Sequence, residues 1–374
     1  MAESTRLVDL IQLRIDEFLG ERAVELTTIS PELSLVTDLA SGFLSGGKRF
    51  RGLFCYWGWQ SVTSVATDEI DPLAPNEVSA DLPGVVLAAA ALEVFHAAAL
   101  VHDDIMDNSD TRRGSPAAHK LFEQAHSDAG WNGSAAVFGT SSALLLGDLL
   151  LGWSDELFDS GTALLASPAF GRAARAEFGR MRTEVTAGQY LDILEESAWA
   201  SFPESSALSR AHRVIVYKSA KYSIEAPLAI GAALGGADLR QLSALRAFGL
   251  PLGVAYQLRD DLLGVFGDPA VTGKPAGDDL REGKRTVLIA LARTRLPAPV
   301  RNLMDELLGD PELDAQQIDM LRTALRDCGA VDEMERIIDH NVQLARTAIR
   351  DAPIAASARN QLLQLADTVT RRES

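Results

Sequence analysis

The longest apolar run in the sequence constrains the fold most strongly. It extends from Val85 to Val101, is rich in alanine, contains Glu93 and His96, and leads directly to Asp103. Ionisable side chains inside the run and a carboxylate at its end favour a buried helix over a membrane span. A helix that is apolar around most of its circumference needs other helices on all sides.

Helical periodicity also dominates the rest of the chain. Apolar residues recur at spacings of three and four, whereas the alternation typical of strands is hardly visible. The periodic segments are 7–19, 85–101, 143–158, 173–194, 242–263 and 287–293. Turn-rich breaks lie near 68–84, 126–134, 201–206 and 267–279, and none is long enough for an interdomain linker. We therefore predict a single all-α domain over residues 1–374, with 85–107 and 242–263 as central helices.

The net charge restricts the classes of ligand. The formal charge is −17, from 52 acidic and 35 basic residues. Such an excess of acid argues against a nucleic-acid partner and against adhesion to anionic lipid. An anionic ligand must therefore meet locally arranged cations or bound metal.

The cysteines and the N-terminus indicate a compartment. Cys55 and Cys328 are the two cysteines, which favours neither a disulfide framework nor a cysteine metal site and fits a reducing environment. Residues 1–20 lack the apolar segment of a secretory signal. We expect a cytoplasmic protein.

A first cluster of carboxylates follows the apolar run. In a helix, Asp103 and Asp107 lie one turn apart and about 40° apart around the axis, with Asp104 to the side. Such a cluster is unfavourable unless a cation neutralises it, and hard oxygen ligands suit Mg²⁺, which completes its shell with water and phosphate oxygens. Arg112 and Arg113 follow, and arginine binds phosphate oxygens bidentately. The alternative is an acidic helix end that is simply solvated. In so acidic a chain, this alternative would be preferred if the DDxxD motif stood without the apolar run before it and the arginines after it.

A second cluster, in YQLRDDLLGVFGD, repeats the theme. Asp260 and Asp261 end another apolar helix, and Gln257 lies one turn before them. Gly264 stands one turn after Asp260, so the third carboxylate is missing there. Asp260 and Asp261 could still hold a metal together with Gln257.

Two further segments carry candidate anion-binding cations. SGGKRFRG brings Lys48, Arg49 and Arg51 together beside two glycines, without the spacing of a P-loop. Lys274 and Lys284 lie in glycine-rich surroundings that could fold over a bound anion. Each of these cations, taken alone, is more typical of a solvent-exposed side chain.

Five motifs, in this order and at these separations, resemble those of the trans-isoprenyl diphosphate synthases, the polyprenyl synthetase family. They are GGKRFR, FHAAALVHDDIMDNSDTRRG, GQYLD, YKSA and YQLRDDLLGVFGD, and they span about residues 40–290. The resemblance implies the isoprenoid synthase fold, with antiparallel helices around a deep central cavity, and a homodimer. It also implies that the two Asp-rich motifs face each other across the mouth of that cavity.

The resemblance implies roles for individual residues. The ligands of about three Mg²⁺ ions would be Asp103, Asp104, Asp107, Asp260 and Asp261. Isopentenyl diphosphate would bind to Lys48, Arg51, His96 and Arg113. The allylic diphosphate would bind to Arg112, Lys218, Ser219, Gln257, Lys274 and Lys284. The residues implied in catalysis are Asp103, Asp260, Lys218 and Gln257. Two positions depart from the family pattern, because Ser219 stands where threonine is common and Gly264 replaces the usual last Asp of the second motif.

The implied activity is an Mg²⁺-dependent condensation of isopentenyl diphosphate with an allylic diphosphate. Metal ions and cations would stabilise the departing pyrophosphate, so that the allylic C–O bond breaks to give a carbocation. The double bond of isopentenyl diphosphate would attack the carbocation, and pyrophosphate would accept the proton that is lost. We expect no stable membrane insertion.

The residues before Asp103 predict the length of the product. The growing chain is expected to lie along the helix that ends there, so that residues one and two turns back line its path. Ala98 and Ala99, about one turn back, are small, and Phe95, two turns back, could form the floor. These residues predict a C20 product, geranylgeranyl diphosphate, with longer chains as the alternative.

Other functions are compatible with parts of the sequence. A class I terpene cyclase also uses DDxxD, but DDLLGVFGD lacks the hydroxyl and Glu of the second cyclase motif, and GGKRFR would have no role. A non-catalytic synthase subunit would explain Gly264, although the first motif is intact. An α-helical interaction protein with solvated acidic patches would require all five motifs to be coincidental.

Overall fold

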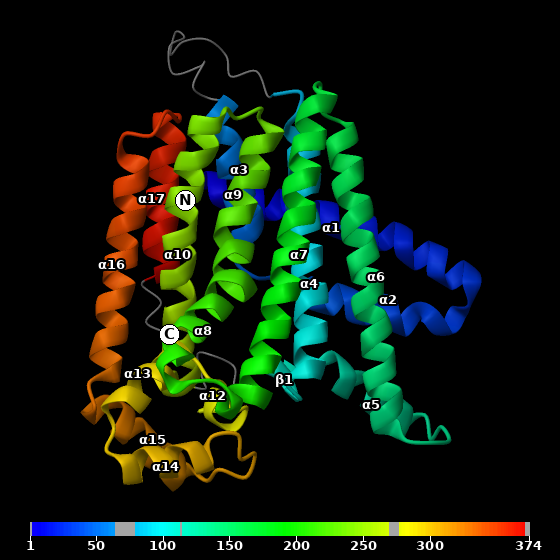
Figure 1. Cartoon of the computed structure of the whole chain (residues 1–374). Helices are drawn as coiled ribbons and strands as arrows, with labels where there is room; N and C mark the ends of the chain where they lie inside the picture. Colours follow the sequence, from blue (N-terminus) through cyan, green and yellow to red (C-terminus); the bar gives the residue numbers. More distant parts are fainter. Residues whose placement is uncertain (1, 64–78, 113, 269–276, 371–374) are drawn as a thin grey trace. The chain divides into compact units, whose positions relative to one another are not determined.

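The structure, a computed structural model, is almost entirely helical in the residues that it describes (Figure 1). The described residues are 2–63, 79–112, 114–268 and 277–370. The fold divides into two compact units that interleave along the chain. Unit 1 comprises residues 1–178, 227–242 and 354–358, and unit 2 comprises residues 179–226, 243–353 and 359–374. The single domain that the sequence predicts stays a prediction.

Unit 1 contains the first half of the chain. Its elements are α1 (Ala2–Ile29), η1 (Pro31–Leu33), α2 (Ser34–Phe43), α3 (Phe50–Thr63), α4 (Leu82–Met106), β1 (Thr111–Arg112), β2 (Ser115–Pro116), α5 (Ala118–Asp128) and α6 (Ala135–Ala163). Four helices have residues in both units: α7 (Pro168–Ala198), α9 (Ala226–Leu234), α10 (Leu239–Phe266) and α17 (Ala356–Thr370).

Unit 2 contains the remaining elements. They are η2 (Trp199–Ser201), η3 (Glu204–Ser206), α8 (Ala207–Val214), η4 (Ile215–Glu225), α12 (Asp278–Arg281), α13 (Val287–Arg295), α14 (Ala298–Leu307), α15 (Ala315–Asp327) and α16 (Ala330–Arg350).

The apolar run forms the centre of unit 1, as the sequence predicts. It lies in α4, which packs against α1, α3 and α6 (Figure 1). The backbones of α4 and α6 approach closely at two glycines, since a Cβ at Gly84 would lie 2.5 Å from the carbonyl oxygen of Gly161. Both helices are long and apolar enough to cross a membrane, but 78% of the apolar window of α4 is buried inside the structure and only 28% of that of α6. The run is therefore a core helix, and α6 keeps an exposed apolar face.

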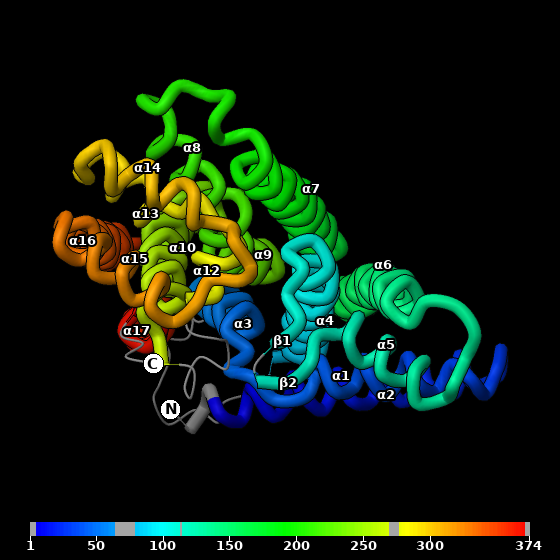
Figure 2. The backbone as a smooth tube through the Cα atoms, turned by 90° about the horizontal axis from the view of Figure 1, so that it is seen from below, coloured from blue at the N-terminus to red at the C-terminus, as the bar shows by residue number. Residues whose placement is uncertain are grey.

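A short antiparallel ribbon follows α4 and precedes α5 (Figure 2). Thr111 pairs with Pro116, and Arg112 pairs with Ser115. Two-residue strands leave no alternation in the sequence, so the ribbon was not predictable from periodicity. Its effect is to fix the backbone of Arg112 shortly after the first Asp-rich motif.

The core of unit 2 forms between α10, α13, α15 and α16, of which the last three contact one another (Figure 2). Leu258, Leu288, Leu325 and Ile338 are almost completely buried in it. The predicted helix 242–263 lies within α10. The carboxylates of the second motif therefore stand on a helix whose other faces are fixed by packing.

The segment η4 is an eleven-residue π-helix, which no pattern in the sequence predicts. It carries Lys218 and Ser219. A π-helix closes its hydrogen bonds between residues five apart and usually occurs as a single turn inside an α-helix, often at a functional site.

Candidate active site

The first Asp-rich motif forms the last turn of α4 in unit 1. Its geometry matches the prediction, since the N–H of Asp107 donates to the carbonyl oxygen of Asp103 at 2.8 Å, one helical turn away. Asp103 and Asp107 are partly exposed, whereas Asp104 is completely buried. Two carboxylates of the motif are therefore accessible to a ligand, and the third is directed into the protein.

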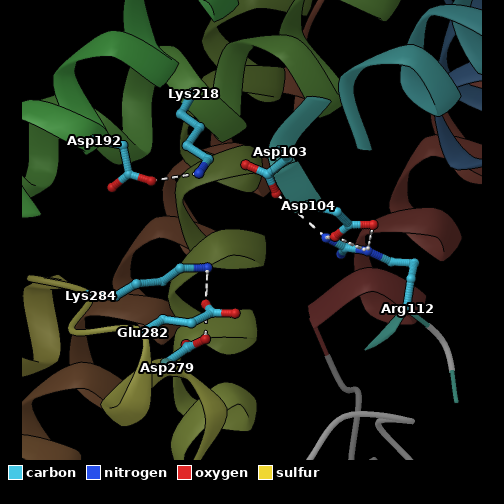
Figure 3. Close-up of polar contacts among 8 residues, drawn as sticks. All are labelled: Asp103, Asp104, Arg112, Asp192, Lys218, Asp279, Glu282 and Lys284. Carbon is cyan, nitrogen blue, oxygen red and sulfur yellow. Dashed lines mark hydrogen bonds and ion pairs between the residues drawn. The ribbon is translucent and has the colours of Figure 1, made fainter. Parts of the chain in front are cut away.

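Arg112 neutralises the buried carboxylate (Figure 3). Its Nε donates to Asp104 Oδ1 at 2.9 Å and lies 3.2 Å from Oδ2, and its Nη2 also donates to Oδ1. The same Nη2 lies 3.6 Å from Asp103 Oδ2. Arg112, which the family resemblance assigns to the allylic diphosphate, thus contacts the first Asp-rich motif itself. The metal-ligand role predicted for Asp104 stays a prediction, and its contacts here fit a supporting role.

Arg49 anchors the GGKRFR segment, although the sequence groups it with Lys48 and Arg51 as a candidate anion-binding cation. Arg49, buried and left-handed at φ 49°, donates to Gln12 Oε1 at 2.5 Å and also to the carbonyl oxygen of Leu44. Its Nη1 lies 3.6 Å from Glu93 Oε2, and Glu93 Oε1 accepts a hydrogen bond from the N–H of Gly52 at 2.9 Å.

Lys48 and Arg51, which are predicted to bind isopentenyl diphosphate, flank the anchored Arg49 in the sequence. Lys48 is exposed and Arg51 is partly exposed. His96, also partly exposed, follows Glu93 by one turn of α4. Arg113 lies outside the described residues.

The predicted chain-length residues lie on α4. Ala98 is fully buried and Ala99 is partly exposed. Phe95 is 4% exposed, and its ring packs edge-on against Phe178 with the ring centroids 6.1 Å apart. Phe178 in turn stacks on Phe158 at 4.3 Å. Phe95 is therefore connected through Phe178 to Phe158, and its predicted role as a floor stays a prediction.

The second Asp-rich motif ends α10 in unit 2. Asp260 is exposed, and Asp261 is 6% exposed. Gln257 Nε2 donates to Asp261 Oδ1 at 2.8 Å, while Asp261 Oδ2 is buried and accepts no hydrogen bond from the part of the chain that the structure describes. Burial raises the pKa of Asp261, and the carboxylates of Asp279 and Asp260 raise it further, against the opposing effects of the Gln257 hydrogen bond and the Lys284 charge.

A carboxylate from another helix occupies the space beside Gly264. A Cβ added at Gly264 would lie 2.9 Å from Asp279 Oδ1 and closer still to Oδ2. Lys284 Nζ lies 2.7 Å from Glu282 Oε2 and 4.0 Å from Asp279 Oδ1 (Figure 3). Asp279 and Glu282 were not among the predicted site residues, although GDDLREGK places both within five positions of Lys284.

Lys218 is held by a residue of a motif to which we assigned no role. Its Nζ lies 2.5 Å from Asp192 Oδ2, the last residue of GQYLD (Figure 3). Ser219 follows it on η4 and is partly exposed. Lys274 lies outside the described residues.

These donors fit a hard divalent cation. Asp103 and Asp107 are partly exposed in unit 1 and Asp260 is exposed in unit 2, where the buried Oδ2 of Asp261 accepts no hydrogen bond from the described residues. Across the described residues, no three His, Cys, Asp or Glu side chains converge into a ready metal site. A cation held by either Asp-rich motif would take much of its coordination shell from water and substrate oxygens, as Mg²⁺ does at phosphate sites.

Comparison with known proteins places the chain. A sequence model of the polyprenyl synthetase family matches residues 34–325. A crystal structure of geranylgeranyl pyrophosphate synthase from Corynebacterium glutamicum, complexed with isoprenyl diphosphate and magnesium, is 35% identical with a TM-score of 0.89, over 98% of this chain and 99% of that one.

Two curated relatives have other products in their names. Geranylfarnesyl diphosphate synthase of Aeropyrum pernix is 31% identical over 89% of this chain and 94% of the relative. Farnesyl diphosphate synthase of Geobacillus stearothermophilus is 32% identical over 76% of this chain and 87% of the relative. The family match covers most of the sequence and the structural match nearly all of it, which confirms the resemblance carried by the five motifs. The chain is a member of the polyprenyl synthetase family with the all-α isoprenoid synthase fold.

Proposed function

We propose that the protein is a Mg²⁺-dependent prenyltransferase that joins isopentenyl diphosphate head-to-tail, in the trans configuration, to an allylic diphosphate. The observation that carries the proposal is the end of α4, where accessible Asp103 and Asp107 stand beside a buried Asp104–Arg112 pair. Carboxylates and a guanidinium in one place can bind a metal and a phosphate together. Family membership supports the same reaction.

The proposed metal ligands and substrate contacts are the residues that the family motifs indicate. Asp103, Asp107, Asp260 and Asp261 would hold about three Mg²⁺ ions, with Asp104 in support. When bound, Mg²⁺ supplies positive charge that stabilises a departing diphosphate. Side chains proposed to contact the allylic substrate are Arg112, Lys218, Ser219, Gln257, Lys274 and Lys284. Those proposed to hold isopentenyl diphosphate are Lys48, Arg51, His96 and Arg113.

The chemistry then needs little from the protein beyond position and charge. The allylic C–O bond breaks, and its electron pair leaves with pyrophosphate. The π-electrons of isopentenyl diphosphate form the new C–C bond to the allylic carbon, and a proton is lost to restore an alkene. Pyrophosphate is the proposed base, and Lys218 and Gln257 orient the reacting groups.

A reconstituted assay tests this activity. Purified protein is given Mg²⁺, isopentenyl diphosphate and each allylic diphosphate in turn, and products are identified by mass spectrometry. We expect condensation that a chelator abolishes. Pyrophosphate release without isopentenyl diphosphate would instead favour a terpene cyclase, and a protein that gives no product alone but alters a partner synthase would be a non-catalytic subunit.

We further propose a C20 product, geranylgeranyl diphosphate. Relatives named for geranylgeranyl, geranylfarnesyl and farnesyl products resemble the chain to similar degrees, so the family leaves the length open. The support is local, because Phe95 is backed by the ring of Phe178 and cannot retreat easily. Phe95→Ala should lengthen the product, whereas Phe122→Ala, a loss of a buried ring in α5, should not. An unchanged product from Phe95→Ala would contradict the floor assignment.

We also propose that the protein is a homodimer. The support is an exposed apolar face on α6, where Val137, Leu144 and Leu145 are 65%, 50% and 62% exposed. Residues seven and eight apart lie on one side of a helix, so these side chains form one stripe. An apolar stripe on a long helix is typical of a subunit interface.

A further inference from the structure

One face of α7 carries three residues that contact η4. Glu184, Gly188 and Asp192 are spaced four apart, and residues at this spacing share a helix face. Glu184 Oε1 lies 2.7 Å from Lys221 Nζ, and Asp192 Oδ2 lies 2.5 Å from Lys218 Nζ. Gly188 stands between the two ion pairs. This face of α7 therefore contacts η4 through the carboxylates of Glu184 and Asp192 and, between them, through the backbone of Gly188.

Gly188 allows the backbones of α7 and η4 to meet. A Cβ at Gly188 would lie 2.7 Å from Lys218 Cα and closer still to the nitrogen of Lys218. A second glycine does the same on α10, where a Cβ at Gly253 would lie 2.7 Å from Ala220 Cα and closer still to its carbonyl oxygen. These neighbours are backbone atoms, which cannot rotate away as a side chain can. An alanine at either position would force η4 to move.

The π-helix needs such contacts. Eleven residues with hydrogen bonds between positions five apart are far longer than the single turn in which this geometry usually occurs. Ion pairs with α7 hold Lys218 and Lys221, and the end of η4 is held by Arg246 Nη1, which donates to Glu225 Oε1 at 2.6 Å. The contacts on η4 therefore come from both α7 and α10.

We propose that Gly188 and Gly253 are positioning residues for Lys218, and that they act by fixing the π-helical backbone of η4. With the backbone held against both helices, Lys218 Nζ stays at Asp192 and is presented in one orientation to the allylic diphosphate. A return of η4 to α-helical hydrogen bonding would rotate Lys218 and Ser219 about the helix axis relative to their present direction. The expected loss of activity rests on the proposed prenyl transfer. The expected change in the backbone of η4 does not.

The test compares Gly188→Ala and Gly253→Ala with Gly179→Ala. Gly179 is the matched control, because it lies on α7 and an added Cβ there meets nothing within 4 Å. For the first two variants we expect roughly a 10- to 100-fold loss in kcat/KM for the allylic diphosphate, as for other misplaced binding groups. The KM for isopentenyl diphosphate should stay within about twofold, because its proposed ligands lie on other elements. Gly179→Ala should match the wild type.

Hydrogen–deuterium exchange provides a readout that does not depend on activity. Amides of residues 215–225 should exchange faster in both glycine variants, while those of α4 and α16 keep wild-type rates. Should Gly188→Ala not fold, Glu184→Gln removes one ion pair of the same face and should accelerate exchange in 215–225 alone.

Unchanged exchange in 215–225, or an equal loss for both substrates, would overturn the inference. A wild-type protein without prenyl transfer would instead refute the proposed function, and the exchange measurement would still decide the role of the glycines.

Discussion

Asp104 and Asp107 of the first Asp-rich motif have different surroundings. Replacing Asp104 should therefore mainly affect stability, and replacing Asp107 should mainly affect activity. Asp104 is fully buried against Arg112, whose side chain is only 17% exposed. Breaking a buried pair by removing one partner usually costs about 3 kcal/mol or more, so Asp104→Asn should lower the free energy of unfolding by about that amount. Asp107→Asn, at a partly exposed position, should change it by less than about 1 kcal/mol and still abolish prenyl transfer. Urea unfolding and the product assay distinguish the two. Equal destabilisation by both variants would contradict this division.

The two thiols should differ as strongly in reactivity. Burial raises the pKa of Cys55 to about 12, and Cys328 is partly exposed. Since the thiolate is the reactive form, a native sample at pH 8 should react through Cys328 alone with a thiol reagent, and an unfolded sample through both. Cys328→Ser should leave the native protein unreactive. Fast reaction of that variant would show that Cys55 is accessible.

The same shift has a consequence for stability. The folded-state pKa lies above the ordinary value of 9.0, so the unfolded chain loses this proton first as the pH rises. The contribution of Cys55 to the free energy of unfolding should be constant below pH 9 and should fall between pH 9 and about 12. Comparison of Cys55→Ala with the wild type over this range isolates the contribution from that of other groups.

At the scale of elements, sequence periodicity identifies the long helices that are buried on most sides. The segments 85–101 and 242–263 lie inside α4 and α10, because a helix buried on most sides leaves a long apolar pattern. The conversion of 215–225 to a π-helix leaves no such pattern. The π-helix has close backbone contacts with Gly188 and Gly253. Both glycines lie more than 25 residues from the positions in 215–225 that they contact, so local sequence does not reveal these contacts.

The same limit applies to the candidate site. The motifs identify Asp103, Lys218 and Asp261 as candidates, but they do not reveal which partner each side chain contacts. Asp279 is the clearest case, because only the folded chain brings its carboxylate beside Gly264. Its sequence position, in the segment GDDLREGK with four other charged residues, is equally compatible with a solvated loop.

The exposed face of α6 makes the oligomeric state testable through one element. Leu144→Arg together with Leu145→Arg should convert the proposed dimer to a monomer, since buried charges without partners oppose association. Leu239→Arg is the control, because Leu239 is 86% exposed at the start of α10. Light scattering after size exclusion gives the mass directly. A double variant that keeps the mass of a dimer would place the interface elsewhere.

At the scale of the whole molecule, the protein and its proposed substrates carry charge of the same sign. A chain with a net charge of −17 repels a diphosphate at long range, while the local cations attract it at short range. Salt screens the long-range part first, because the Debye length falls from about 30 Å at 0.01 M to about 8 Å at 0.15 M. At constant free Mg²⁺, we therefore expect kcat/KM for isopentenyl diphosphate to rise about twofold or more as NaCl increases over this range. The value of kcat at saturating substrate should change little, since encounter no longer limits the rate there. A steady fall of kcat/KM from the lowest salt would show instead that local cations dominate the field met by the incoming substrate.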